Sequence, residues 1–341
     1  MAGKSKRASP ASGLFFAAAL AALLFLGTRP AAPYHTASKN LPAADGAAGP
    51  QILALPAAET AAENVFFPFS SPAQTAAPLP PEAPVFSVTG SEPEYKSSGT
   101  VYFKNQTDYD IDIAAMLSRA SPVTLSGEGV QVLVMHTHGT EAYTPSAGHT
   151  YTASGDYRTT DSACNMLAVG QRVTDILNAR GIQTVHSETL NDYPAYNGSY
   201  SRALKDINAW VDRYPSVRLV LDLHRDAIGT AGHYYKTAAQ VNGRQTAQLM
   251  FVTGTDQGGL SHPNWRENLA FQAQLHDRLN SLYPGIMRPM SIRTGRFNQH
   301  VQTGSMLVEV GACGNTLEEA LAAAELFAET LADALLEESP S

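Results

Sequence analysis

Hydrophobic residues from residue 99 onward follow two alternating spacings. The first is a short continuous run rich in Val, Ile and Leu, and it occurs at Val130–Met135, Ile182–His186, Val217–Leu223, Ala247–Thr253, Met290–Arg293 and Ser305–Val310. Runs this short and this rich in β-branched residues are typical of buried strands. A further strand is predicted at Thr100–Lys104, and Ala227–Arg244 is predicted to be a loop or hairpin region.

Between these runs, apolar residues recur every three or four positions, which predicts amphipathic helices. The helices are expected over Asp161–Arg180, Ser199–Tyr214 and Asn264–Leu282, and a last one begins at the capping-box pair Thr316 and Glu319. Strands that alternate with helices indicate an α/β fold. We expect a mostly parallel twisted sheet with helices on both faces, formed by a single domain over residues 99–341.

The amino-terminal part differs from this domain in composition. Lys4, Lys6 and Arg7 precede the apolar run Leu14–Leu26, which is typical of an export signal. The run has about 13 residues, fewer than the ~20 of a typical membrane span, so a cleaved signal peptide is the alternative to the uncleaved anchor that we predict over residues 1–28. Such an anchor would place the protein in the cell membrane with its domain on the extracytoplasmic side.

Residues 29–98 are rich in Ala and Pro and show no sustained period, so they are predicted to be a disordered tether. The apolar pair Val85 and Phe86 interrupts this composition and is interpreted as incidental.

The net charge of −8 argues against nucleic acid as a partner, because phosphate binding needs concentrated Lys and Arg. Cys164 and Cys313 are far apart and fit no metal-finger spacing, so disulfides are not expected to hold the domain together.

Ionisable residues stand at the ends of three predicted strands. They are His136, His138 and Glu141 after the first run, His224, Arg225 and Asp226 after Val217–Leu223, and Glu309 in the last run. Because the carboxyl ends of parallel strands meet at one edge of a sheet, we expect these groups to converge.

Two imidazoles and one carboxylate are ligands that a catalytic zinc ion takes. The predicted ligands are His138, Glu141 and His224, for one Zn²⁺ per domain. His136 is the alternative to His138 and is otherwise expected either to support a metal ligand from behind or to contact substrate. Glu309 is predicted to be the general base, since burial raises a carboxyl pKa; its alternative role is a structural ion pair with an arginine.

Arg225 is predicted to donate to a developing oxyanion or to orient His224. Together these groups predict a metal-assisted hydrolysis.

Five segments carry a resemblance to a known family: MHTHGTEAY, SYSRAL, VLDLHRDA, GRFNQ and LVEVGACGNTLEEA. In this order and at these separations, the region from Gly129 to Leu336 resembles the stage II sporulation protein P family. The resemblance implies a fold similar to zinc-dependent N-acetylmuramoyl-L-alanine amidases. It also implies peptidoglycan amidase and endopeptidase activity during engulfment, membrane anchoring in the intermembrane space of the sporangium, and sporulation proteins D and M as partners.

The family pattern extends to single residues. His138 and His224 match the amidase ligands, and LVEVG matches the strand that carries the catalytic glutamate. The family places Glu141 directly after the two histidines, whereas amidases place this ligand at the start of the next helix, here near Asp161. Asn298 and Gln299 match the family's NQ pair and are expected to line the substrate groove.

Two other classes of function are compatible with the sequence. A thiol hydrolase would use Cys313 or Cys164 together with a histidine. A non-catalytic wall-binding scaffold would keep the fold without the chemistry.

Overall fold

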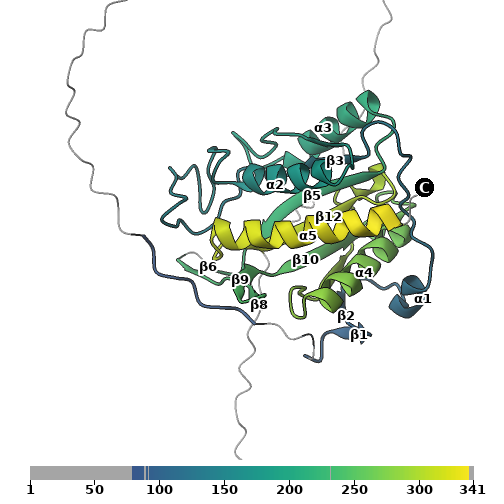
Figure 1. Cartoon of the computed structure of the whole chain (residues 1–341), viewed down its shortest axis with the longest axis horizontal. Helices are drawn as coiled ribbons and strands as arrows, with labels where there is room; N and C mark the ends of the chain where they lie inside the picture. The colour runs from purple at the N-terminus through teal and green to yellow at the C-terminus, as the bar shows by residue number, and fades with distance from the viewer. Residues whose placement is uncertain (1–78, 88–89, 91, 231, 338–341) are drawn as a thin grey trace, which may run out of the picture. The chain divides into compact units, whose positions relative to one another are not determined.

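The computed structural model describes residues 79–337 except 88–89, 91 and 231 (Figure 1). Its main feature is a sheet of eight strands in the order β1-β2-β11-β10-β12-β5-β3-β4. The strands are β1 Lys96–Ser98, β2 Val101–Asn105, β3 Val132–Met135, β4 Thr184–His186, β5 Leu219–Asp226, β10 Leu249–Gly254, β11 Met290–Arg293 and β12 Met306–Ala312.

The predicted anchor over residues 1–28 and the tether up to residue 78 lie outside the described residues. Within the described part of the chain, none of the helices has the length and apolar character that a membrane crossing requires.

The sheet consists of two parallel groups of strands that run in opposite directions. β12, β5, β3 and β4 are parallel to one another, and so are β2, β11 and β10. The groups meet at the antiparallel pair β10 and β12, and β1 adds an antiparallel edge strand. The predicted mostly parallel sheet is confirmed. Its carboxyl-terminal edge at β12, β5 and β3 is where the predicted ionisable residues meet.

Helices cover both faces of the sheet, as predicted. On one face, α5 (Leu317–Glu337) lies between α2 (Met166–Ala179) and α4 (Trp265–Leu282), and the short α1 (Ile113–Leu117) contacts α4 (Figure 1). These helices and the sheet share one large apolar core. On the other face, α3 (Ser199–Arg213) packs Ala203 and Ile207 against Leu133, Met135 and Val220.

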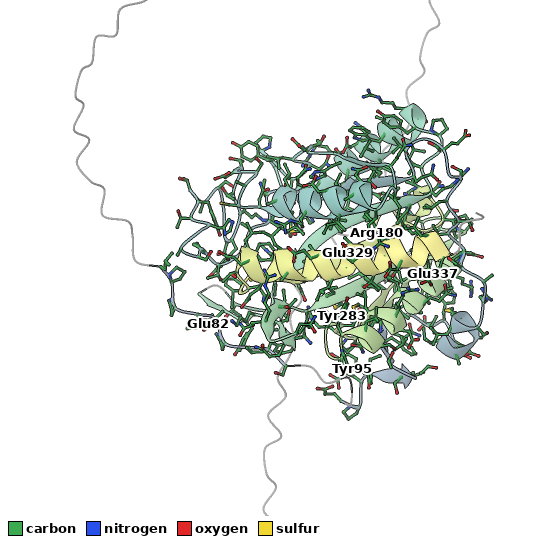
Figure 2. All side chains as sticks on the ribbon, viewed as in Figure 1. Glu82, Tyr95, Arg180, Tyr283, Glu329 and Glu337 are labelled. Carbon is green, nitrogen blue, oxygen red and sulfur yellow. The ribbon has the colours of Figure 1, made fainter. Side chains whose placement is uncertain are left out.

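Ion pairs join the three adjacent helices at the surface. Arg180 of α2 contacts Glu329 at 2.5 Å and Asp333 at 2.6 Å on α5, and Arg278 of α4 contacts Glu337 at 2.5 Å; Figure 2 labels Arg180, Glu329 and Glu337. Exposed pairs of this kind contribute about 0–1 kcal/mol each. The buried apolar face therefore dominates the attachment of these helices.

Strand alternation separates apolar from polar residues along β5. Leu219, Leu221 and Leu223 enter the core beneath α2 and α5, so Asp222 and His224 point to the face that α3 covers. The same parity directs Val308 and Val310 of β12 into the core and Glu309 to the opposite face.

The capping box that opens α5 is confirmed: the amide of Glu319 donates to Thr316 Oγ1 at 3.3 Å, and Glu319 Oε2 accepts from the amide of Thr316 at 3.2 Å. Asn264 precedes α4 as expected, although its side chain makes no capping hydrogen bond. α2 begins later than predicted, because Asn165 caps it by accepting from the amide of Leu167 at 2.9 Å.

Residues 79–87, which we call the strap, pack on the domain although they were predicted to belong to the tether. Val85 forms a β-bridge with Lys236, the amide of Phe86 donates to the Lys236 carbonyl at 2.7 Å, and the Lys236 amide donates to the Pro84 carbonyl at 3.0 Å. Lys236 is buried and pairs with Glu82 of the strap and with Glu319 at 2.9 Å. The predicted domain boundary at residue 99 therefore lies too far along the chain.

The predicted loop or hairpin region holds two small hairpins that follow β5. They are formed by β6 (Gly229–Thr230) with β7 (His233–Tyr234) and by β8 (Ala238–Val241) with β9 (Arg244–Ala247). A 3₁₀ turn, η1 (Gln299–Val301), precedes β12.

Candidate active site

Four of the predicted site residues come together at the carboxyl-terminal edge of the sheet. His138 and Glu141 lie in the loop after β3, and His224 and Glu309 occupy paired positions on β5 and β12. The rings of His138 and His224 are perpendicular, with centroids 5.2 Å apart, and Glu141 Oε2 lies 3.7 Å from His224 Nδ1. The expected convergence is therefore observed in the fold.

Glu141 is a buried carboxylate held from two sides. Its Oε2 accepts from the backbone amide of Arg225 at 3.1 Å, and its Oε1 accepts from Arg158 at 3.2 Å. Burial raises the pKa of Glu141, but the charges of Arg225, His138, His224 and Arg158 outweigh burial and lower this pKa below its ordinary value. Glu141 is thus ionised, as a metal ligand must be.

His138 is buried next to two tyrosines. Its ring stacks on Tyr196 with centroids 4.7 Å apart and meets Tyr200 edge-on at 5.6 Å. Burial lowers the pKa of His138 to about 4. The Nδ1 atom of this neutral imidazole has no hydrogen-bond partner among the described residues.

His224 is paired with Asp222, a residue that the sequence analysis did not select. Asp222 Oδ1 lies 2.9 Å from His224 Nε2, but off the direction of a hydrogen bond. Burial lowers the pKa of His224, and the Asp222 carboxylate outweighs it, so that the pKa rises to about 9. Asp222 itself accepts from the amide of Thr137 at 2.8 Å and from its hydroxyl at 2.6 Å. The signal for Asp222 was a charged residue inside an otherwise apolar strand.

The carboxyl group of Glu309 lies in a buried position, as predicted for a carboxyl group with a raised pKa. Its Oε2 is buried without a hydrogen-bond partner among the described residues. Burial, followed by the nearby Asp226 carboxylate, raises the pKa of Glu309 to about 8. The carboxyl group is therefore protonated at neutral pH in the metal-free protein and close to the range where it exchanges a proton.

The chemistry of the donors fits zinc: two imidazoles and one carboxylate lie together in a buried position, and His138 Nδ1 and His224 Nε2 make no hydrogen bond within the described part of the chain. As placed, however, no three His, Cys, Asp or Glu side chains of the described residues converge as they would around an ion. Glu141 is turned towards Arg158 and the Arg225 amide, and His224 is turned towards Asp222. The zinc site remains a prediction.

Asp161, the alternative ligand to Glu141, is exposed, and its Oδ1 accepts from the amide of Ala163 at 3.0 Å. Glu141, in contrast, lies beside both histidines. The geometry therefore favours Glu141 over Asp161.

Arg225 is placed differently from the predicted oxyanion donor. Its Nε donates to the carbonyl of Ala142 at 2.9 Å and its Nη2 to that of Tyr157 at 2.8 Å, while Nη1 lies 4.0 Å from Glu141 Oε1. These contacts hold the loops on either side of Glu141. Arg225 thus fits a positioning role, and direct catalytic contact stays a prediction.

His136 was expected to contact substrate or to support a metal ligand, and its burial argues against the substrate contact. The ring is fully buried, with Nδ1 3.0 Å from the carbonyl of Leu223 and Nε2 2.9 Å from His186 Nε2. Because carbonyl oxygen only accepts, Nδ1 carries the proton in this contact, and Nε2 accepts from His186. Gly170 of α2 leaves the room for this pair, since a Cβ there would stand 2.5 Å from both Nε2 atoms.

Gln299 was also expected to line a substrate groove and is instead used by the backbone. Its amide donates to the carbonyl of Val252 at 2.7 Å and accepts from the amide of Gly254 at 2.8 Å, so both ends are engaged in a buried position. Asn298 donates to the carbonyl of Tyr200 at 2.8 Å and so supports the first turn of α3. A groove contact by Asn298 stays a prediction.

Asp192 and Arg158 also belong to the site and were not found from the sequence. Asp192 accepts from the amide and hydroxyl of Thr140 at 3.1 and 2.5 Å and from Arg158. Since Arg158 also contacts Glu141, the loop after β3 is tied to the loop after β4. Isolated polar residues in loops gave no sequence signal for this link.

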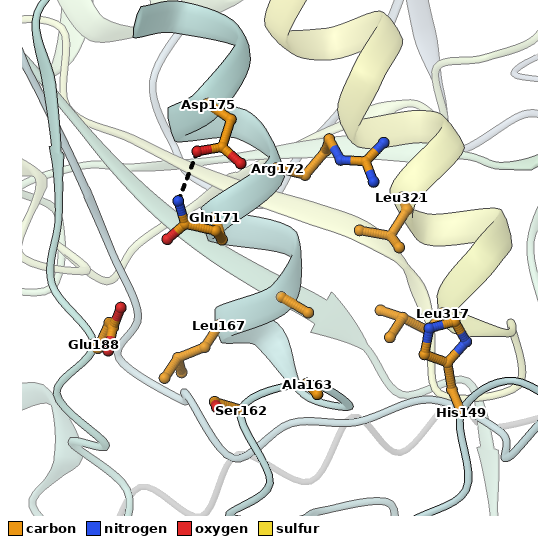
Figure 3. Close-up of a pocket in the computed structure, with 11 residues that line it drawn as sticks. His149, Ser162, Ala163, Leu167, Gln171, Arg172, Asp175, Glu188, Leu317 and Leu321 are labelled. Carbon is orange, nitrogen blue, oxygen red and sulfur yellow. Dashed lines mark hydrogen bonds between the residues drawn. The ribbon is translucent and has the colours of Figure 1, made fainter.

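A hollow of about 420 Å³ lies between the amino-terminal turns of α2 and α5, lined by Leu167, Gln171, Leu317 and neighbouring residues (Figure 3). None of the four converging site residues lines it. The hollow is therefore separate from the candidate active site.

Comparisons with known proteins agree with the sequence resemblance. Residues 80–332 match the family model of stage II sporulation protein P. Stage II sporulation protein P of Bacillus subtilis (strain 168) is 27% identical over 229 residues, which cover 62% of this chain and 54% of the relative. The chain thus matches about half the length of that relative.

Two solved structures are similar in part. N-acetylmuramoyl-L-alanine amidase AmiC2 of Nostoc punctiforme is 16% identical, with a TM-score of 0.34, over 62% of this chain and 97% of that one. The amidase Ami1 of Mycobacterium smegmatis is 16% identical, with a TM-score of 0.37, over 61% of this chain and 98% of that one. These scores are low, and the α/β fold class rests on the strand pairing described above. Since the family model spans most of the chain, this chain belongs to the stage II sporulation protein P family.

Proposed function

We propose that the domain is a zinc-dependent peptidoglycan hydrolase that cleaves the amide bond between muramic acid and the stem peptide. One observation carries the proposal: the buried Glu309 carboxyl, whose pKa is raised to about 8, stands beside His224 at the edge where His138 and Glu141 converge. Family membership and the chemistry of these donors support it.

In this proposal His138, Glu141 and His224 hold one Zn²⁺. A zinc ion bound there would polarise the scissile carbonyl and lower the pKa of water at the site. The Glu309 carboxylate takes a proton from the attacking water and returns it to the leaving amide nitrogen. The Asp222 carboxylate lies beside His224, and the charges of Arg158 and Arg225 favour the ionised form of Glu141.

We further propose the finer properties that the family resemblance implies. They are cleavage of peptide cross-links, action during engulfment at the cell membrane through an amino-terminal anchor, and work with sporulation proteins D and M. The match covers about half of the B. subtilis relative, so each of these properties needs its own test on this chain.

Two competing functions make different predictions. A thiol hydrolase is disfavoured because Cys164 and Cys313 are both buried and burial raises the pKa of each thiol, which suppresses the reactive thiolate. Its activity would also survive chelation. A non-catalytic scaffold would bind peptidoglycan without stoichiometric zinc, so metal content after dialysis distinguishes it from the proposed hydrolase.

The decisive experiment is mass spectrometry of purified sacculi digested by the native chain, by Glu309→Gln and by a control, Glu325→Gln, at a surface ion pair. The native chain and the control should release stem peptides with a free amino-terminal alanine, and EDTA should stop this release. The rate of release by Glu309→Gln should be about 10²–10⁴-fold lower than that of the native chain. Release by Glu309→Gln at the native rate, or no release by the native chain, would refute the proposal.

A further inference from the structure

We propose that Tyr193 and Tyr196 form a binding subsite for the glycan strand. Sugar rings of the strand stack on these two side chains, beside the scissile bond. We call these two side chains the tyrosine ledge. The inference rests on the proposed function for the identity of the substrate, and it adds a recognition site that the metal ligands and Glu309 do not explain.

The tyrosine ledge lies in the loop between β4 and α3 and is open to solvent. Tyr193 is 52% exposed and Tyr196 is 51% exposed, although both are large aromatic residues. Exposed aromatic side chains grouped in one loop are a common sign of a binding site. Tyr196 stacks on His138 of the candidate active site, and Tyr193 precedes it by three residues in the same loop, so we interpret the pair as a substrate contact.

Tyr196 places the ledge directly at the reaction site. Its ring lies nearly parallel to that of His138, at an interplanar angle of 16°, and the guanidinium carbon of Arg158 lies 4.9 Å from its ring centroid. A group bound against Tyr196 is thus next to a predicted metal ligand. On the proposed substrate, the muramic acid residue is the sugar nearest to the scissile amide.

The loop that carries the ledge is held in shape by one arginine. Arg202 of α3 donates to the carbonyls of Asn191 at 2.6 Å and Asn197 at 3.1 Å, and also to that of Ala195. These three carbonyls span the loop on both sides of Tyr193 and Tyr196. A pre-shaped aromatic surface binds without the cost of ordering a loop, which favours recognition of an extended polymer.

The charges around the ledge favour sugar over stem peptide. A stem peptide carries carboxylates, which would need a free cation. The Arg158 guanidinium is already engaged by Glu141 and Asp192, and that of Arg202 by backbone carbonyls. What the ledge offers is the exposed ring of Tyr193, the half of the Tyr196 side chain that His138 and Arg158 leave exposed, and two phenolic hydroxyls. Ring faces suit the C–H faces of a pyranose, and the hydroxyls suit its polar rim.

The test measures binding in the absence of cleavage. The full-length chain carrying Glu309→Gln is titrated, in detergent, with peptide-free glycan strands of alternating N-acetylglucosamine and N-acetylmuramic acid, and separately with free stem peptide. We expect it to bind the glycan. Tyr193→Ala with Tyr196→Ala should weaken this binding by about tenfold or more, since each aromatic contact contributes roughly 0.5–1.5 kcal/mol. Replacing both residues by Phe should keep most of the affinity.

Leu282→Ala is the matched control, because Leu282 is 52% exposed at the end of α4. If the double Ala variant fails to fold, Tyr193→Ala alone carries the test, since Tyr193 is 52% exposed and its loss should still weaken glycan binding. Unchanged glycan binding by the Ala variants, no glycan binding at all, or binding of stem peptide alone would overturn the proposal.

The two proposals fail in different ways. If glycan binding depends on the ledge but the native chain releases no stem peptide, the proposed hydrolase function is refuted and the subsite is supported. Stem peptide release by the native chain, with glycan binding unaffected by the Ala variants, would do the reverse.

Discussion

Glu309 of β12 and His224 of β5 stand opposite each other in a parallel pair of strands, with both side chains on the face of the sheet that α3 covers. A slip of one residue in either strand would turn one of these side chains into the apolar core. The register of the sheet, rather than any loop, thus sets the distance between the proposed base and the proposed metal ligand.

This arrangement predicts a pH-dependent effect of Glu309 on stability in the metal-free protein. The folded pKa of Glu309 is about 8, above its ordinary value of 4.5, so the unfolded chain loses this proton first as pH rises. The stabilisation is complete below about pH 4.5 and is lost as pH approaches 8. In EDTA, the free energy of unfolding of Glu309→Gln, relative to that of the native chain, should therefore increase by on the order of 1–4 kcal/mol from pH 5 to pH 8. Urea unfolding at the two pH values measures this gain, and a difference that does not change with pH would contradict it.

Asp222 should control how tightly zinc binds, because its carboxylate lies 2.9 Å from His224 Nε2 and is itself held by two hydrogen bonds from Thr137. We expect Asp222→Asn to lower zinc affinity about 10–100-fold, as loss of a carboxylate behind a histidine ligand does elsewhere. Thr137→Val is the graded control: it removes the hydroxyl contact but keeps the backbone one. Competition with a chromophoric chelator gives both affinities, and equal values for the native chain and Asp222→Asn would rule out this role.

Gly170→Ala should reverse the usual effect of alanine in a helix. Alanine normally stabilises a helix interior by about 0.5–1 kcal/mol relative to glycine. Here the new Cβ would stand 2.5 Å from Nε2 of both His136 and His186, so we expect a loss of about 1–3 kcal/mol. The half-buried His186 is the partner more able to move. Thermal unfolding of Gly170→Ala with and without His186→Ala forms a double-mutant cycle, and a coupling energy near zero would show that the crowding is absent.

The sequence predicted the features that neighbouring residues determine, and it missed those that depend on contacts between residues far apart in the chain. Val130–Met135 and Ser305–Val310 were recognisable as strands because burial and β-branching are local properties, and Glu309 followed from its strand. The correction for His136 could not be foreseen, because its burial depends on Gly170 and His186 from other elements. Gln299 looked like a groove residue by family pattern, whereas its two hydrogen bonds serve β10.

The strap should stabilise the domain, although it lies in a stretch with the composition of a linker. A chain that begins at residue 88 loses two backbone hydrogen bonds to Lys236 that a chain beginning at residue 79 keeps, and we expect it to be less stable by about 1–3 kcal/mol. Glu82→Gln in the longer chain should cost much less, since Glu319 still pairs with Lys236. Melting temperatures of the three proteins check this order, and equal values for the two lengths would show that the strap is dispensable.

The strap also limits how far from a membrane this domain can work. If the chain is anchored up to residue 28, as we propose, residues 29–78 separate the anchor from the strap. Fifty residues reach at most ~170 Å when fully extended, and a freely coiled chain of that length averages roughly 40 Å between its ends. Under the proposed anchoring, the strap therefore sets an upper limit on the distance between the membrane and the domain.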